Sequence, residues 1–408
     1  MQIITPEYIL TPQNLLRNFS VAFDKTIHKI APLEELKILF PDAKIIKLQK
    51  NSLLMPGLIN AHVHVEFSAN KTELSYGDFI PWLYSVLENR ETLIEGCKKG
   101  CMREAISCML ESGITTFGAI SSHGMDLDVC ADAKQNVVFF NELIGSQATM
   151  ADALFADFLA RLDASKSVNR EGFYPAIAIH SPYSVHPILI KKALQIVKNE
   201  NLKLTAHFME SSAEREWLDK SEGDFKEFFE KLLKQNSATC GASEFLEHFN
   251  EQQTLFTHVV KANEEELLSI KKGNHTIIHC PISNRLLGNG ALDLNEINKK
   301  NINWICATDG LSSNYKLDLF EEMKCALFMH SNMPLLPLAK QLISSVTKDA
   351  ALALGINSGE IEEGKNADML VLDLDKEPND ELAIHLILHR YNISQIYING
   401  KLIPKKGA

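Results

Sequence analysis

The chain has 408 residues, of which 45% are hydrophobic and 23% charged, and its formal net charge at pH 7 is -11. This length suffices for one large domain or two, and the composition is that of a globular protein. The negative charge argues against nucleic acid or an anionic membrane surface as a partner. No apolar run is long enough to span a bilayer, and no basic signal-peptide segment precedes an apolar one. Because the eight cysteines form no C-x-x-C pair, we expect a cytoplasmic protein with buried thiols rather than disulfides.

Short β-type runs alternate with longer helical stretches through most of the chain. The helical stretches include Glu91–Glu111, Pro187–Asn199 and Asn263–Lys271. Such alternation is typical of βα units on a parallel sheet, and eight units predict an α/β fold of the (β/α)8 TIM-barrel type. The eight candidate strands are Leu58–His64, Ile114–Ala119, Val137–Leu143, Tyr174–His180, Leu202–Phe208, Thr254–Val259, His275–Cys280 and Asn303–Thr308.

The two ends of the chain do not fit a barrel. Residues 1–55 consist of short strand-like pieces, and Asp368–Asp373 is followed by an alternating segment, Ile393–Ile403. Asn399-Gly400 within that segment is a hairpin turn signal. We therefore predict a small β-sandwich domain built from residues 1–55 and 360–408, with the barrel spanning residues 56–359.

Potential metal ligands lie at the ends of four predicted strands. His62 and His64 close the first strand and share one face of it, since side chains at i and i+2 of a strand point the same way. His207 and His258 end the fifth and sixth strands, and Asp309 follows the eighth. Because active sites of such barrels lie at the carboxyl ends of the strands, these side chains should converge. Three histidines and an aspartate suit a divalent metal that keeps a position open for water and lowers its pKa to about 7.

A site with two metals usually requires a bridging group, often a modified lysine at the end of the fourth strand. The fourth strand here ends in His180-Ser181-Pro182, and no lysine lies between Lys166 and Lys191. The sequence therefore favours a single metal ion.

Five motifs and a closing segment resemble the amidohydrolase superfamily, in its branch of cytosine-, adenosine-derivative- and triazine-type aminohydrolases. The resemblance covers nearly the whole chain and includes a return segment into a terminal β-sandwich. The motifs are residues 56–64 (PGLINAHVH), 181–184 (SPYS), 207–210 (HFME), 279–284 (HCPISN) and 308–314 (TDGLSSN), and the closing segment is 359–368 (GEIEEGKNAD).

This resemblance implies roles for the residues at the strand ends. It assigns His62, His64, His207 and Asp309 as ligands of one Zn²⁺ or Fe²⁺ ion, and it places His258 in contact with the hydroxide or the substrate. The implied reaction is hydroxide attack on an amidine-like ring carbon, during which Asp309 takes up the released proton. Glu210 is implied as the shuttle that protonates a ring nitrogen and then the departing ammonia. His258 stabilises charge developing on the oxygen.

The region after the first strand narrows the substrate class. Residues 65–72 and 79–83 resemble the aminofutalosine deaminases of bacteria that make menaquinone by the futalosine route. Enzymes of that group convert 6-amino-6-deoxyfutalosine to futalosine, and relatives act on adenosine or methylthioadenosine. The resemblance therefore implies a small nucleoside substrate in menaquinone biosynthesis, and related barrels often form homodimers.

Three side chains in this region are candidate substrate contacts. Glu66 lies two residues beyond His64, so an extended backbone would put it on the ligand face, close to a ribose diol or a base N–H. Phe67 is its neighbour. Trp82 is placed to cap an aromatic ring together with Phe79, although packing in a helix core explains these two rings equally well.

Further candidates lie after other strands. Glu142, Ser184 and His186 occupy positions at the barrel mouth, where ordinary loop capping is an equal alternative. His279 is expected to be structural or to support a ligand. Ser313 and Asn314 are expected to hold the loop that carries Asp309.

Two other classes of function remain open from the sequence. One is a different superfamily reaction: deamination of S-adenosylhomocysteine, guanine, cytosine or a triazine, or dechlorination of a halogenated ring. The other is a catalytically inactive barrel that serves as a scaffold. Inactive relatives typically lose metal ligands, whereas all the expected ones are present here.

Overall fold

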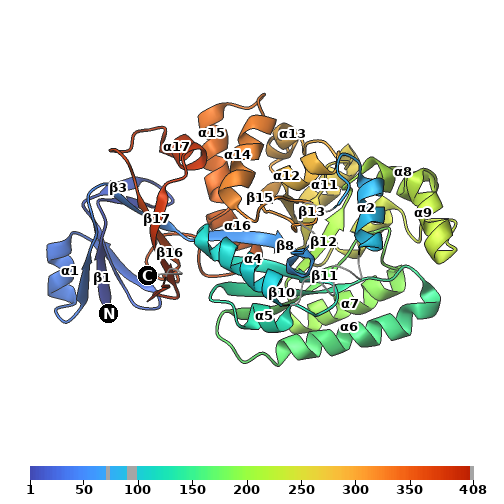
Figure 1. The fold of residues 1–408 in the computed structure, drawn as a ribbon, viewed down its shortest axis with the longest axis horizontal. Helices are drawn as coiled ribbons and strands as arrows, with labels where there is room; N and C mark the ends of the chain where they lie inside the picture. Colours follow the sequence, from blue (N-terminus) through green and yellow to red (C-terminus); the bar gives the residue numbers. More distant parts are fainter. Residues whose placement is uncertain (70–73, 90–98, 405–408) are drawn as a thin grey trace.

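The structure is a computed structural model that describes residues 1–69, 74–89 and 99–404. The larger part of the fold is a parallel sheet of eight strands, curled into a nearly closed barrel (Figure 1). All eight predicted barrel strands are confirmed, with their ends within two residues of the predicted ones. In the order β8 to β15 they are Leu58–Val63, Ile114–Ser121, Asn136–Leu143, Phe173–Ile179, Leu204–Phe208, Leu255–His258, Thr276–His279 and Asn303–Cys306.

Almost every residue of these strands is buried, because the sheet is covered on both faces. Alternate residues of β8 divide between two apolar clusters: Leu58 packs in the larger core, whereas Ile59 and Ala61 pack in a smaller second core. This double burial explains why the barrel strands are uniformly apolar in the sequence.

Hydrogen bonds join β8 to the segment that follows β15, at the two ends of the strand order. The Asp309 N–H donates to the His62 carbonyl at 3.1 Å. The Asn60 amide donates to Thr308 Oγ1 at 2.7 Å, and Asn60 Oδ1 accepts from the Thr308 N–H at 3.1 Å. These contacts bring the first and last strands of the barrel together at their carboxyl ends.

Helices connect the strands and surround the barrel (Figure 1). The predicted helices at 187–199 and 263–271 are confirmed as α7 and α11, and the described part of the predicted helix 91–111 is α4; residues 91–98 lie outside the described ranges. The helices of this part are α2 (Phe79–Glu88), α4 (Gly100–Glu111), α5 (Leu127–Ala131), α6 (Ala151–Lys166), α7 (Pro187–Glu200), α8 (Ser212–Lys220), α9 (Asp224–Leu233), α10 (Ala242–His248), α11 (Glu264–Lys272), α12 (Pro281–Leu286), α13 (Leu294–Lys299), α14 (Leu319–Met329), α15 (Leu335–Ser345) and α16 (Lys348–Leu354).

Two further sheets lie beside the barrel, the first built from the N-terminal segment alone and the second from both ends of the chain (Figure 1). One has the strand order β5-β4-β1-β6 and the other β18-β17-β16-β7-β2-β3. Apolar side chains of the two sheets, such as Ile4, Val21, Leu54 and Val371, form one core. The elements are β1 (Gln2–Thr5), β2 (Tyr8–Leu10), β3 (Leu15–Arg17), β4 (Ser20–Phe23), β5 (Ile27–Ala31), α1 (Leu33–Leu39), β6 (Lys44–Lys47), β7 (Ser52–Pro56), β16 (Met369–Asp373), α17 (Leu382–Leu388), β17 (Asn392–Ile398) and β18 (Lys401–Leu402).

The predicted sandwich of both termini is therefore confirmed, and Asn399 and Gly400 form the expected hairpin turn with φ of 48° and 73°. The division at residues 55/56 and 359/360 stays a prediction. Among the described helices, none has the length and apolar character needed to cross a bilayer. The seven cysteines of the described ranges are free thiols.

The buried histidine His275, just before β14, makes the stability of the fold depend on pH. Its ring packs edge-on against Phe256, and its Nδ1 accepts from the Thr254 N–H at 3.1 Å. Burial lowers the pKa of His275 to about 4, whereas a histidine in an unfolded chain titrates near ~6.5. The unfolded chain therefore binds more protons between these values, so stability present above pH ~6.5 is lost as the pH falls towards ~4.

We expect the His275→Gln variant, whose amide oxygen can still accept from Thr254, to show a weaker pH dependence. Urea denaturation should give a difference in unfolding free energy between pH 7 and pH 5 that is smaller than in the wild type by about 1–2 kcal/mol. An identical difference in both proteins would contradict the protection of His275 from protonation.

Candidate metal centre

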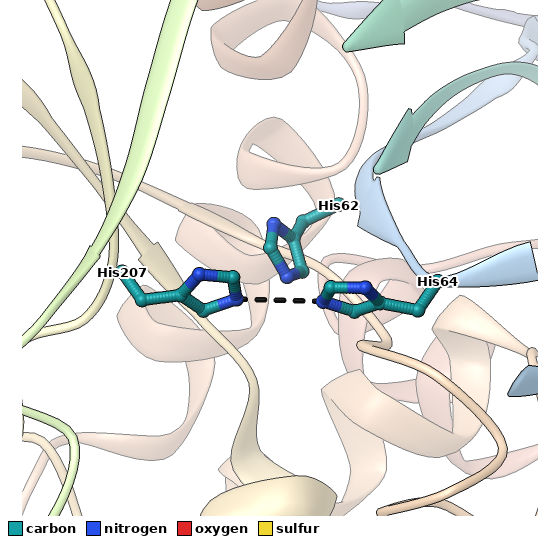
Figure 2. Close-up of side chains that lie close together, drawn as sticks. All are labelled: His62, His64 and His207. Carbon is teal, nitrogen blue, oxygen red and sulfur yellow. Dashed lines mark hydrogen bonds between the residues drawn. The ribbon is translucent and has the colours of Figure 1, made fainter. Parts of the chain in front are cut away.

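Three imidazoles meet at the carboxyl ends of the barrel strands (Figure 2). His62 lies in β8, His64 follows it directly, and His207 lies in β12. One ring nitrogen of each lies within 4.8 Å of the others, and His64 Nε2 is 3.4 Å from His207 Nε2. The predicted convergence of these three side chains is thus present in the fold.

Asp309 adds a carboxylate to this cluster. Its Oδ1 lies 3.7 Å from His62 Nε2 and 3.6 Å from His64 Nε2. The other oxygen accepts hydrogen bonds from the hydroxyls of Ser283 at 2.7 Å and Ser313 at 2.8 Å. The expectation that Ser313 holds this loop is therefore confirmed. Asn314 also holds it, since its amide donates to the Thr308 carbonyl at 2.7 Å.

The hydrogen bonds of the histidines leave nitrogen lone pairs directed at the cluster. His207 Nδ1 lies 3.0 Å from the His180 carbonyl, which can only accept, so Nδ1 carries the proton and Nε2 the lone pair. His62 Nδ1 contacts Thr257 Oγ1 at 3.2 Å, while His62 Nε2 is fully buried and has no hydrogen-bond partner among the described residues. Most buried polar atoms have a partner, and neutral imidazole is a common metal ligand, so a metal ion would be a fitting partner for this nitrogen.

The electrostatics of the cluster fit a cation. Burial lowers the pKa of His207 to about 3, and burial together with the neighbouring histidines holds the pKa of His62 well below its usual value. Burial alone would raise the pKa of Asp309, but His64, His258 and His62 hold it below the ordinary range. Neutral nitrogen donors beside a charged carboxylate form the donor set that Zn²⁺ or Fe²⁺ binds.

Glu210 and His258 lie beside this donor set. Glu210 Oε1 accepts from the Asn289 amide at 3.1 Å, and Glu210 Oε2 is 3.6 Å from His258 Nε2. His258 Nδ1 contacts Asn284 Oδ1 at 2.9 Å. Burial raises the pKa of Glu210 well above its ordinary value, and it lowers the pKa of His258. Glu210 is therefore suited to hold a proton where ordinary carboxylates have lost it.

The backbone is strained where these strands end. Met209, His258, Val259 and Asp309 have φ of 51°, 75°, 56° and 58°, a region that residues other than glycine rarely adopt. Such strain is characteristic of functional sites, because the surrounding structure must stabilise it. All four are candidate site residues or their immediate neighbours in sequence.

His180 lies beside the cluster, with its ring centroid 5.0 Å from that of His207, although it is not among the site residues predicted from the strand ends. It follows β11 directly, and its Nδ1 lies 2.6 Å from Ser184 Oγ and 3.0 Å from Ser181 Oγ. One ligand atom from each of His180, Glu142 and His207 lies within 4.8 Å of the other two. This second group shares His207 with the first, and His207 Nδ1 also contacts the His180 carbonyl at 3.0 Å. The position of His180 at a strand end was the available sequence signal.

The sequence predicted an extended backbone after His64, which would put Glu66 on the same face as the histidines. This prediction of the backbone is wrong. Residues Val65–Phe67 form a turn of 3-10 helix directly after His64. The Glu66 carboxylate turns to the loop after β9 and accepts the backbone N–H groups of Ser122 at 2.8 Å, His123 at 2.9 Å and Met125 at 2.7 Å. Its acceptor capacity is used within the protein, so it holds a loop at the barrel mouth.

The other candidate substrate contacts differ in the hydrogen bonds and ring contacts that they already make within the protein. The Phe67 ring lies 5.8 Å from the His64 ring, whereas the Trp82 indole donates to the Ser312 carbonyl at 2.9 Å. His186 caps α7 by accepting from the Ile188 N–H. Glu142 Oε2 accepts from Ser122 Oγ at 2.5 Å, while Glu142 Oε1 is buried without a hydrogen-bond partner in the described part of the chain. The contacts of these residues with substrate stay predictions.

His279 has the structural environment expected of it. It is fully buried at the end of β14, and its Nε2 lies 3.1 Å from Nε2 of His330. His330 belongs to the end of α14, on the helical layer of the barrel.

The model of the amidohydrolase family matches residues 53–403. The chain belongs to the amidohydrolase family. An aminodeoxyfutalosine deaminase of a Nitratiruptor species is 50% identical over 403 residues, which cover 98% of this chain and 99% of that protein. An adenosine deaminase of Helicobacter pylori is 37% identical over 95% of each chain.

Solved structures of amidohydrolases share the fold over its whole length. A Helicobacter pylori aminofutalosine deaminase in complex with methylthio-coformycin has a TM-score of 0.93 and 35% identity, over 99% of this chain and 100% of that one. A zinc-bound adenosine deaminase from Xanthomonas campestris, 21% identical, shares the fold with a TM-score of 0.82, over 98% of this chain and 92% of that one. The family match makes the chain a metal-dependent hydrolase acting on carbon–nitrogen bonds.

We expect the His62→Ala variant to lose metal. Removing this buried imidazole leaves fewer donors in the cluster and should weaken metal affinity by at least about 100-fold. Elemental analysis after gel filtration should give about one metal ion per wild-type chain and a small fraction of that in the variant. His275→Gln, which changes a buried histidine away from the cluster, should keep the full complement. Full occupancy in His62→Ala would contradict its role as a ligand.

Proposed function

We propose that this chain is a hydrolytic deaminase of adenine nucleoside derivatives that converts 6-amino-6-deoxyfutalosine to futalosine and ammonia in menaquinone biosynthesis. The observation that carries the proposal is the 50% identity to an aminodeoxyfutalosine deaminase over nearly the full length of both chains. The likeness to an aminofutalosine deaminase that binds a nucleoside analogue supports it.

The proposed metal ligands are His62, His64, His207 and Asp309, around one Zn²⁺ or Fe²⁺ ion. When bound, this ion supplies the Lewis acidity that makes water a nucleophile at neutral pH. Asp309 has a second role in the proposal, since its carboxylate can take the proton that the attacking water releases. The serine hydroxyls on its Oδ2 keep the carboxylate oriented while it does so.

Glu210 is the proposed proton shuttle. Its Oε1 accepts from Asn289, so the proton of the neutral acid is placed on Oε2, on the side of His258. From there it can pass to a ring nitrogen of the substrate, which makes the ring carbon more electrophilic. Ammonia is a poor leaving group until protonated, so the proton that Asp309 takes from the water must pass to the departing amine. The Glu210 carboxylate, which has given up its own proton, delivers it.

His258 is the proposed partner of the attacking oxygen. With its Nδ1 proton directed to Asn284, neutral His258 offers Nε2 as an acceptor to the water. While Nε2 holds the proton that leaves the water, before that proton passes to Asp309, the imidazolium stabilises negative charge on the oxygen.

Glu142 is the strongest of the proposed substrate contacts. Its buried Oε1, which has no hydrogen-bond partner among the described residues and lies 3.9 Å from His207 Nδ1, can accept from a ribose hydroxyl or a base N–H. Phe67, Trp82, Ser184 and His186 complete the proposed surroundings of the nucleoside, and Glu66 acts on it through the loop that contains Ser122.

Adenosine is the second candidate substrate, because a Helicobacter pylori protein 37% identical to this chain is an adenosine deaminase. A comparison of kcat/KM on aminofutalosine, methylthioadenosine, S-adenosylhomocysteine, adenosine, guanine and cytosine separates the alternatives. We expect the highest value for aminofutalosine and the lowest values for the two free bases, with ammonia release as the readout. A preference for guanine or cytosine would contradict the proposal, and an absence of turnover on all six would favour a scaffold.

The Glu210→Gln variant tests the proton shuttle. Glutamine keeps the size and the hydrogen bond to Asn289 but cannot transfer a proton, so kcat should fall by about 10²–10⁴. Metal content should be that of the wild type. The matched control is Glu216→Gln, an exposed carboxylate on α8, which should retain full activity. Wild-type turnover by Glu210→Gln would exclude the proposed role.

A further inference from the structure

Glu214 is a buried carboxylate close to the metal centre that no step of the mechanism uses. It lies in the first turn of α8 and its exposed fraction is 1%. Its Oε1 accepts the backbone N–H of Met209 at 3.0 Å, and its Oε2 accepts the backbone N–H of Glu210 at 2.7 Å. Both oxygens are therefore directed to the backbone that carries the proposed proton shuttle.

These contacts differ from those of an ordinary helix start. Ser211 caps α8 by accepting from the Glu214 N–H, and a glutamate at this position normally bonds the N–H of the capping residue itself. Glu266 does so in α11, where it accepts from the Asn263 N–H at 2.8 Å. Glu214 instead bonds the two residues before its cap. Capping of α8 alone does not account for this choice of partners.

The conformation of Met209 explains why the backbone needs such support. Met209 has φ of 51°, which is unfavourable for a residue with a side chain. Its carbonyl accepts from the Lys261 N–H at 2.8 Å, so Glu214 and the segment after β13 hold both sides of this residue. The turn at Met209 directs the next side chain, Glu210, towards Asn289 and His258.

We propose that Glu214 is a positioning residue that fixes the backbone of Met209 and Glu210 and thereby holds the Glu210 carboxyl in its reactive place. This inference rests on the proposed function of Glu210 as the proton shuttle. It concerns placement only, because Glu214 contacts the backbone and not the reacting groups.

The Glu214→Gln variant removes one acceptor with little change of shape. One carboxylate oxygen becomes an NH₂ group that faces a backbone N–H, so one of the two hydrogen bonds is lost. Small displacements of a catalytic group lower the rate strongly, because reactive geometry depends on close alignment of the reacting atoms. We expect kcat to fall about 10- to 100-fold while KM changes by less than about threefold.

Hydrogen exchange provides a readout that does not depend on catalysis. The amides of Met209 and Glu210 should exchange at least about tenfold faster in Glu214→Gln than in the wild type, measured by mass spectrometry on a peptide spanning residues 208–213. Metal content should stay unchanged. If Glu214→Gln does not fold, Glu214→Asp, whose side chain is one methylene shorter, is used in the same measurements.

Ser211→Ala is the matched control, because it removes the other half of the α8 cap and leaves the Glu214 carboxylate in place. It should lower the Tm but keep kcat within about threefold of the wild type. A fall in kcat equal to that of Glu214→Gln would overturn the proposal, since any loosening of the helix start would then suffice.

A double variant decides whether Glu214 acts through Glu210. Adding Glu214→Gln to Glu210→Gln should cause little further loss of kcat, since the group being positioned is no longer a shuttle. A further loss of the full 10- to 100-fold, or unchanged exchange at residues 209–210, would overturn the proposal. If the wild type deaminates no nucleoside, the proposed function fails, while the exchange measurement still tests the contact between Glu214 and this backbone.

Discussion

The site depends on holding three imidazoles and one carboxylate close together in the buried mouth of the barrel. His62 Nε2 and His64 Nε2 lie 3.7 and 3.6 Å from one oxygen of Asp309, and His207 Nε2 lies 3.4 Å from His64 Nε2. Burial lowers the pKa values of His62 and His207 and so keeps both imidazoles neutral. Their rings therefore carry no positive charges that would repel each other. A cation between these groups would satisfy all of them at once, and the rest of the barrel mouth supports this arrangement.

The contacts that close the barrel also place two of the proposed metal ligands. The reciprocal hydrogen bonds of Asn60 and Thr308 lie two residues before His62 and one before Asp309. The bond from the Asp309 N–H to the His62 carbonyl continues this junction. The first and last strands therefore cannot separate without moving a histidine and the carboxylate apart. The left-handed backbone of Asp309 is stabilised at the same point by hydrogen bonds from Ser283 and Ser313.

The hydrophobic pattern of the sequence correctly predicted the barrel strands and the histidine pair at the end of the first strand. Barrel strands buried on both faces are continuous apolar runs, and His62 and His64 at the end of one run share a face whatever the rest of the fold does. Glu66 was misplaced because the chain leaves the extended conformation immediately after His64, which alternation cannot reveal. His180 was missed because Glu142 and His207, the other members of its group, come from other strands. Glu214 was missed because Ser211-x-x-Glu214 matches an ordinary helix cap. Both depend on contacts that only the folded chain forms.

The arrangement of the terminal strands has a consequence for synthesis on the ribosome. Strand β7 pairs with β16 along its whole length, and only Gly57 separates β7 from β8. When the eight barrel strands have left the ribosome, β7 still lacks its neighbour β16. The pairing becomes possible only when residues 369–373 emerge. Residues 369–373, which are synthesised after all eight barrel strands, thus complete the sheet to which the first histidine-bearing strand is attached.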